Sequence, residues 1–399
     1  MPPVQQGASS RDRRIASIDG LRGVAVLAVF CVHYFEIAQG LTRTHDGLVA
    51  ALHSIDLGRC GVVLFFAISG FVIPSTMRRD GGKGLRTFLV NRFFRLFPAF
   101  WLSIPISAAA RWWNQKIVLT VQDLVLNMTM IPNALGAVPA NGAYWTLAIE
   151  LTFYALCALI FIGRGERLPF LYAMLGCLGF IVFMSSQPSI FGNFINEGRL
   201  SPDTLTMCLY LGIMLWATVI RMWWSGAEVD ILSKAACVGF AAFWILWEPA
   251  KLIHAYATDN FFDVDQRLIC GYSIPLAVFV GGLLLIRLEW HWLTWIGRIS
   301  YSFYLCHGPV AMLVVSTFMW AQWTHAGVYW FAVVVSASLT LLVSQAMFTF
   351  VEAPSIRLGY RLVGQRVPPS SVAEASHASR PRDASSPVVA SKVRDKAVL

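Results

Sequence analysis

Three side chains that can hold a charge or move a proton lie inside the first long apolar stretch, residues 15–34. They are Asp19, Arg22 and His33. A lipid-facing helix excludes such groups, because each charge costs about 2.5–3.5 kcal/mol at the centre of a membrane span. We therefore expect them to face a protein interior or a water-filled cavity, with the other helices arranged around this stretch. Asp19 and Arg22 are three positions apart, so they can also simply neutralise each other.

His33 follows Arg22 by eleven residues, which corresponds to about 16 Å along a helix. This spacing predicts that the two side chains lie in different halves of the bilayer, with Arg22 on the cytoplasmic side. A neutral imidazole can take a proton from a hydroxyl group near pH 7. The alternative is a buried histidine that is hydrogen-bonded to a backbone carbonyl, and the spacing alone favours neither.

A second intramembrane acid, Glu150, lies in the sequence YWTLAIELTFY (144–154). If this span starts on the outer side, helix rise places Glu150 about 10 Å deep, which could match the depth of His33. A buried carboxylate needs a partner. A pair of Glu150 with His33 would orient the imidazole and stabilise its protonated form. The alternative is a structural ion pair with an arginine, and we favour the functional pair.

Two arginines, Arg92 and Arg95, lie in NRFFRLFPAFW (91–101) at the start of the third apolar stretch. Their spacing places both guanidinium groups on one helix face. Guanidinium groups bind phosphates bidentately, so this pair could hold a phosphorylated ligand. Arginines at a cytoplasmic helix end are also common orientation signals, and the motif alone does not separate the two roles.

Further polar residues lie in the ninth apolar stretch, in the run SYSFYLCHGP (300–309). Tyr304 and His307 share a helix face by their spacing, and Tyr301 lies one turn before Tyr304. Such residues are more often packed in a core than reactive. Ser69, next to Gly70, favours close approach of two helices over a nucleophilic role.

The sequence contains no motif for a metal site, a disulfide framework or a nucleotide-binding loop. The eight cysteines form no CxxC pair, and the histidines form no HxxxH or HExxH set, so we expect neither a metal site nor a disulfide framework. The chain carries no GxGxxG and no GxxxxGK[ST] motif. The net charge of +9 would suggest nucleic acid in a soluble protein, but the basic residues lie beside apolar stretches, as orientation signals do. We therefore expect no nucleic-acid partner.

The composition predicts an all-α polytopic membrane protein. Of the 399 residues, 57% are hydrophobic and only 13% are charged, whereas a soluble domain has about 25% charged residues. About ten transmembrane helices can be drawn, and alternate loops are basic, which predicts that both termini are cytoplasmic. We assign residues 1–14 to a cytoplasmic segment, 15–358 to one membrane domain and 359–399 to a disordered cytoplasmic tail.

Segment 117–136 is more polar, and we expect an interfacial or re-entrant piece there. The ninth span is long, and Gly308-Pro309 is the expected site of a kink. The ten predicted spans are 15–38, 59–77, 93–110, 143–162, 168–185, 204–220, 231–248, 266–286, 294–319 and 328–351.

Taken in order, these motifs resemble the acyltransferase-3 family of integral membrane O-acyltransferases. The resemblance rests on IDGLRGVAVLAVFCVH (18–33), VVLFFAISGF (62–71), FLVNRFFRLFPAFW (88–101), YWTLAIELTFY (144–154), WIGRISYSFYLCHGPV (295–310) and FVEAPSIRL (350–358). It implies an acetyl-CoA or other acyl-CoA donor and a hydroxyl acceptor on an envelope or exported carbohydrate or a lipid-linked sugar; we expect no metal cofactor, because the ligand motifs are missing. It also implies a protein of the lipid bilayer, which for a bacterium is the inner membrane.

The resemblance also implies roles for single residues. His33 is implied to be the catalytic histidine, Glu150 the acid of the site, and Arg92 and Arg95 the contacts of the coenzyme A phosphates. Arg22 matches the family's arginine before the histidine. The remaining site candidates, whose roles stay open, are Asp19, Ser69, Trp145, Tyr301, Ser302, Tyr304 and His307. Many family members have two adjacent acids where this chain has Glu150-Leu151, so a mechanism that needs both carboxylates is not expected here.

Two other functions remain open on the sequence. The acceptor could be a small secondary metabolite such as a macrolide. The chain could also be a proton-coupled transporter that uses the same intramembrane groups as a proton relay, without covalent chemistry. Transporters often show inverted repeats, and we find no such symmetry.

Overall fold

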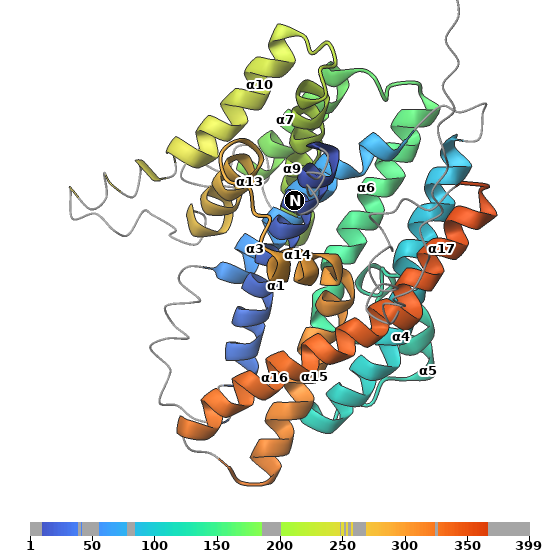
Figure 1. Ribbon diagram of the computed structural model, residues 1–399, viewed down its shortest axis with the longest axis vertical. Helices are drawn as coiled ribbons and strands as arrows, with labels where there is room; N and C mark the ends of the chain where they lie inside the picture. Colours follow the sequence, from blue (N-terminus) through green and yellow to red (C-terminus); the bar gives the residue numbers. More distant parts are fainter. Residues whose placement is uncertain are drawn as a thin grey trace, which may run out of the picture.

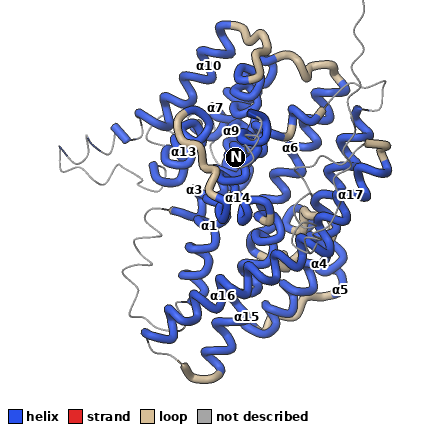
Figure 2. The backbone as a smooth tube through the Cα atoms, in the orientation of Figure 1, coloured by secondary structure: helices blue, strands red, loops and turns tan. Residues whose placement is uncertain are grey.

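The described part of the protein is helical, with no strand among its residues (Figures 1 and 2). The computed structural model describes residues 10–38, 41, 56–77, 84–185, 201–247, 249–250, 253, 257, 269–323 and 326–365. The expectation of an all-α membrane protein is confirmed. Residues 1–9 and residues 366–399 of the predicted tail (359–399) lie outside the described residues, so disorder of that part of the tail stays a prediction.

Where the connections between helices are described, they are loops and turns without strand structure (Figure 2). The bounds of the helices are α1 Ser10–Ala38, α3 Leu57–Val72, α4 Gly84–Gln115, α5 Val121–Asn127, α6 Trp145–Ile162, α7 Pro169–Met184, α9 Pro202–Trp224, α10 Ile231–Ala242, α13 Ile274–Leu284, α14 His291–Arg298, α15 Ser300–Trp320, α16 Ala326–Met347 and α17 Ala353–Leu362. Three π-helical turns lie at Phe243–Trp247, Ile269–Ser273 and Phe348–Glu352.

Seven helices in the described residues are long and apolar enough to cross a membrane. They run over Ala16–Ala38, Leu57–Thr76, Gly84–Gln115, Gly142–Ile162, Asp203–Trp224, Ser300–Trp320 and Gly327–Leu362. Three shorter apolar helices, Pro169–Met184, Ile231–Leu246 and Gly271–Leu284, fall on the other three predicted spans. Each predicted range therefore overlaps an apolar helix. The number of spans that cross the bilayer and the side of each terminus stay predictions.

The ninth range differs from the expected kinked span. The helix breaks at Ile299, between α14 and α15, while Pro309 lies inside the uninterrupted α15. A proline lacks the N–H that would bond the carbonyl four residues earlier, here that of Leu305. The side chain of Asn141 donates to this carbonyl, with an Nδ2–O distance of 3.4 Å. A neighbouring segment thus satisfies the group that the proline leaves open, which is how such helices continue within a membrane.

The polar segment 117–136 forms no span. It contains the two-turn α5, and its N-terminus carries a capping box in which Thr120 and Asp123 each bond the other's backbone N–H. At the far end of the chain, α17 runs past residue 358 to Leu362, and Asn91 of α4 donates to the side chain of Gln365. The ordered domain therefore extends a few residues beyond the predicted boundary.

Helix α1 packs against α3, α13, α14 and α15, as expected for the stretch around which the bundle is built (Figure 1). Helix α3 also packs against α9. Both α3 contacts depend on glycine. A Cβ atom at Gly61 would lie 2.5 Å from the carbonyl oxygen of Ala25, and one at Gly70 would lie 2.0 Å from the carbonyl oxygen of Met214. Small residues let the helices touch along their backbones, and helix association in a membrane depends on such contact.

The substitution Gly70→Ala is expected to destabilise the protein by about 1–3 kcal/mol, because the added methyl group has to push α9 away from α3. Thermal unfolding in detergent measures the change. Gly281→Ala is the matched control, since a Cβ atom there meets nothing within 4 Å. Equal stability of the two variants would contradict this packing.

Candidate active site

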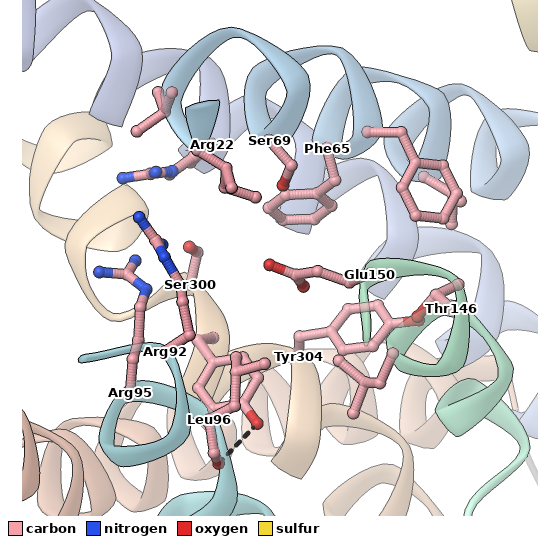
Figure 3. A pocket seen from close by; sticks show the side chains of 16 residues that line it. Arg22, Phe65, Ser69, Arg92, Arg95, Leu96, Thr146, Glu150, Ser300 and Tyr304 are labelled. Carbon is pink, nitrogen blue, oxygen red and sulfur yellow. Dashed lines mark hydrogen bonds between the residues drawn. The ribbon is translucent and has the colours of Figure 1, made fainter. Parts of the chain in front are cut away.

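A cavity of ≈ 90 Å³ lies inside the bundle, with walls from α1, α3, α4, α6 and α15 (Figure 3). A cavity of this size has room for several water molecules or a small acyl group. Seven of the residues singled out in the sequence line this cavity: Arg22, Ser69, Arg92, Arg95, Glu150, Tyr301 and Tyr304. Side chains that are far apart in the sequence are thus brought to one internal space.

One end of the cavity is strongly cationic. The guanidinium groups of Arg22, Arg92 and Arg95 lie close together there (Figure 3). Arg22 donates to the Asp19 carboxylate at 3.0 Å, so the expected neutralising pair is formed. Three cations around one cavity attract an anionic group, and guanidinium groups suit phosphate.

The two arginines of α4 differ in their contacts. Arg92 donates to the hydroxyl of Thr76 at 2.9 Å and lies 5.5 Å from the centre of the Tyr154 ring. Arg95 makes no hydrogen bond or close ion pair within the described part of the chain, and its electrostatic interactions are led by Glu352. The N–H donors of the Arg95 guanidinium are therefore available to bind a ligand.

Glu150 faces the same cavity from α6. Its carboxylate points towards the arginine side chains (Figure 3). One oxygen accepts a hydrogen bond from the Tyr154 hydroxyl at 2.5 Å. No arginine lies within ion-pair distance of Glu150 in the described residues, although Arg95 feels its charge. The carboxylate thus offsets part of the positive charge without closing the cavity.

Glu352 is a functional candidate that the sequence analysis missed. It is 2% exposed and ends the π-helical turn Phe348–Glu352. Ser302 donates to its carboxylate at 2.6 Å, which gives the predicted candidate Ser302 a definite partner outside the cavity lining. The motif FVEAPSIRL did contain an acid within an apolar range, and an intramembrane acid is itself a signal of function.

His33 lies outside the cavity lining and contacts another histidine. Its Nδ1 atom is 3.1 Å from Nε2 of His307, whose own Nδ1 is 2.6 Å from the carbonyl oxygen of Tyr304. The expected contact between His33 and Glu150 is not formed: the imidazole of His33 contacts His307, and the carboxylate of Glu150 contacts the Tyr154 hydroxyl. The Tyr304 ring lines the cavity on one side and lies 5.5 Å from the His307 ring on the other.

The wall between the cavity and the two histidines is held by hydrogen bonds. The Tyr304 hydroxyl is 2.7 Å from that of Thr146 and donates to the carbonyl of Ala143. Tyr301, one turn earlier, donates to the carbonyl of Leu96. Trp145 lies outside the cavity, is 41% exposed and packs its ring on Tyr210.

Helix α15 therefore contributes residues both to the charged cavity and to the histidine pair. At one end, guanidinium groups and carboxylates surround a space that suits an anionic ligand. At the other end, a histidine pair offers a site for proton transfer. Among the residues that the structure describes, no three His, Cys, Asp or Glu side chains gather as metal ligands would.

Known proteins place the chain in a family. The model of the acyltransferase-3 family, described as an acyltransferase domain, matches residues 15–349. YrhL of Bacillus subtilis (strain 168), named as a candidate peptidoglycan O-acetyltransferase, is 25% identical over 89% of this chain and 57% of its own length. "O-acetyltransferase OatA" of Staphylococcus aureus (strain NCTC 8325 / PS 47) is 25% identical over 88% of this chain and 58% of its own length.

A third relative is covered more fully. "Exopolysaccharide production protein ExoZ" of Rhizobium meliloti (strain 1021) is 24% identical over 77% of this chain and 92% of its own length. This chain thus spans little more than half of YrhL and OatA and most of ExoZ. No solved structure matches it significantly. With a family model that covers most of its length, the chain belongs to the acyltransferase-3 family of membrane acyltransferases.

Proposed function

We propose that this protein transfers an acetyl or other short acyl group from acyl-CoA to a hydroxyl group of an envelope or exported carbohydrate. The observation that carries the proposal is the cavity in which Arg22, Arg92 and Arg95 converge from two helices. A cluster of cations within a membrane protein is energetically costly, and such groups usually mark a functional site. The phosphates of coenzyme A supply the negative charge that such a cluster selects.

The donor would enter at the arginine end and extend along α15. Arg92 and Arg95 would hold the phosphates, while Arg22 is already paired with Asp19. His33 lies eleven residues after Arg22 on α1, a distance of about 16 Å along the helix axis. The extended pantetheine arm bridges the space between phosphates and thioester in acyl-CoA. The acyl group would have to displace the Tyr304 side chain to approach His33.

The transfer itself would be a direct displacement at the thioester. The acceptor oxygen bonds to the carbonyl carbon while its proton passes to the imidazole of His33. The carbon–sulfur bond breaks, and the coenzyme A thiolate takes the proton from His33, which returns to its neutral form. Glu150 faces the donor cavity and forms no hydrogen bond with His33 in the described residues, so we assign it to the donor end, where its negative charge offsets part of the repulsion between the guanidinium groups before the donor arrives.

The acceptor is proposed from the relatives. The names of YrhL and ExoZ refer to peptidoglycan and to exopolysaccharide, and both polymers carry many hydroxyl groups. Mass spectrometry of surface glycans from cells with and without the gene tests this choice. Acetyl groups that disappear with the gene support a carbohydrate acceptor. Unchanged glycans, together with a newly unacetylated small metabolite, would point to the alternative acceptor.

Coenzyme A is expected to stabilise the purified protein against thermal unfolding. At a concentration of 100 times its Kd, a ligand that binds only the folded state adds about 2.7 kcal/mol. Pantetheine, which lacks the nucleotide and its phosphates, is the matched probe and should give a much smaller shift. Equal shifts with both probes would mean that the guanidinium groups do not hold the phosphates.

A further inference from the structure

We infer that His307 is a positioning residue, which fixes the tautomer of His33 so that its Nε2 lone pair is free to take the acceptor's proton. This inference rests on the proposed function. It assigns a role to a residue that neither the cavity nor the sequence motif explains.

The first step concerns the inner nitrogen of His307. Its Nδ1 atom lies 2.6 Å from the carbonyl oxygen of Tyr304. A carbonyl oxygen can only accept a hydrogen bond, so Nδ1 of His307 has to carry a hydrogen atom. The contact lies within one turn of α15, where the backbone holds it in place.

The second step concerns the outer nitrogen of His307. The residue is 2% exposed, and no acid forms an ion pair with it in the described residues. A buried imidazole without such a partner stays neutral, because an isolated buried charge is costly. A neutral ring with hydrogen on Nδ1 has its lone pair on Nε2. This nitrogen is therefore an acceptor.

The third step concerns the tautomer of His33 on α1. Nδ1 of His33 is 3.1 Å from Nε2 of His307. Since His307 accepts, His33 has to donate from Nδ1, and its own lone pair is left on Nε2. The rings are 5.1 Å apart and tilted by 39°. Two further groups of α1 interact with the His33 ring: the charge of Glu36, about one turn later, and the backbone of Val29, one turn earlier.

The arrangement has the logic of a catalytic triad in which the orienting group is a histidine. An orienting partner matters because the wrong tautomer presents a hydrogen atom, and not a lone pair, to the acceptor. The backbone carbonyl of Tyr304 is the fixed end of this series of hydrogen bonds, which runs through His307 to His33. Tyr304 also lines the donor cavity, so the same turn of α15 borders the donor and orients the histidine.

Solid-state NMR of the full-length protein in lipid nanodiscs tests the tautomer directly. Histidine labelled with ¹⁵N reports which ring nitrogen carries hydrogen, and the His33→Asn variant identifies the His33 signals by difference. The spectrum is recorded without donor or acceptor, so it tests His307 even if acetyl transfer from acetyl-CoA is never observed. We expect hydrogen on Nδ1 of His33. Hydrogen on Nε2 of His33 would overturn it.

Two variants of His307 separate positioning from packing. His307→Leu removes the acceptor, and we expect a mixture of His33 tautomers and a kcat on the order of tenfold lower, with the KM for acetyl-CoA unchanged. His307→Gln keeps an oxygen acceptor and should retain the His33 tautomer and most of the activity. His291→Leu on α14, whose histidine is exposed, is the control. Loss of activity in the glutamine variant with an unchanged His33 spectrum would overturn the inference.

Discussion

Replacing His33 with alanine is expected to lower the kcat of acetyl transfer by on the order of 10²- to 10⁴-fold, the contribution of a positioned general base. The KM for acetyl-CoA should change little, because His33 lies outside the cavity that we assign to the donor. Transfer of labelled acetyl from acetyl-CoA to a crude carbohydrate fraction, measured with the protein in membranes, gives both constants.

The control for this experiment is His291→Ala, which removes an exposed histidine that does not line the cavity. It should leave both constants as they are. If His33→Ala raised the KM for the donor and left kcat unchanged, His33 would be a binding residue and the proposed proton transfer would be wrong.

Replacing Arg95 with glutamine is expected to raise the KM for acetyl-CoA by about 10- to 100-fold. This follows from the loss of a hydrogen bond between charged groups, worth about 1.5–3 kcal/mol. Arg95 has the largest expected effect among the arginines because it makes no hydrogen bond to the rest of the described chain. S-acetylpantetheine, which lacks the nucleotide phosphates, should react equally well with both proteins.

Arg167→Gln is the matched control for Arg95. Arg167 is exposed between α6 and α7, so its loss changes the net charge equally without touching the cavity. A similar rise in KM in both variants would mean that the overall charge attracts the donor. A rise for S-acetylpantetheine in Arg95→Gln would mean that the arginine acts on the pantetheine arm or on the fold.

The helices were predictable because their signal is local. Long apolar runs and the basic residues beside them mark each span, and no information about neighbouring helices is needed. The break at Ile299 was not predictable in this way. Helix α15 can continue through Pro309 only if another group donates a hydrogen bond to the carbonyl of Leu305. The side chain of Asn141, more than 160 positions earlier in the sequence, is that donor.

The sequence singled out several residues that line the cavity, but apart from one ion pair it did not predict which side chains contact each other. Arg92, Arg95 and Glu150 were singled out and do line one cavity. The partner of His33 was predicted wrongly, because the rotation of each helix about its axis decides which side chains meet. The sequence predicts similar membrane depths for His33 and Glu150. Depth does not determine toward which neighbouring helix each side chain points.

Glu352 was overlooked for a similar reason. Its range follows a long apolar helix, and an ordinary α-helical register gives no hint that the acid turns inwards. The structure has a π-helical turn at Phe348–Glu352, and such turns change the direction of the side chains that follow and are frequent at functional sites. Only the fold shows that Ser302 and Glu352 meet.

In the proposed mechanism, the donor extends along α15 from the arginine-lined cavity to His33. A structure with a non-hydrolysable thioether analogue of acetyl-CoA tests it most directly. We expect the phosphates to contact Arg92 and Arg95, and the acyl carbonyl to lie between α1 and α15 beside His33. An analogue whose phosphates lie away from these guanidinium groups, or whose acyl end stays remote from His33, would contradict it.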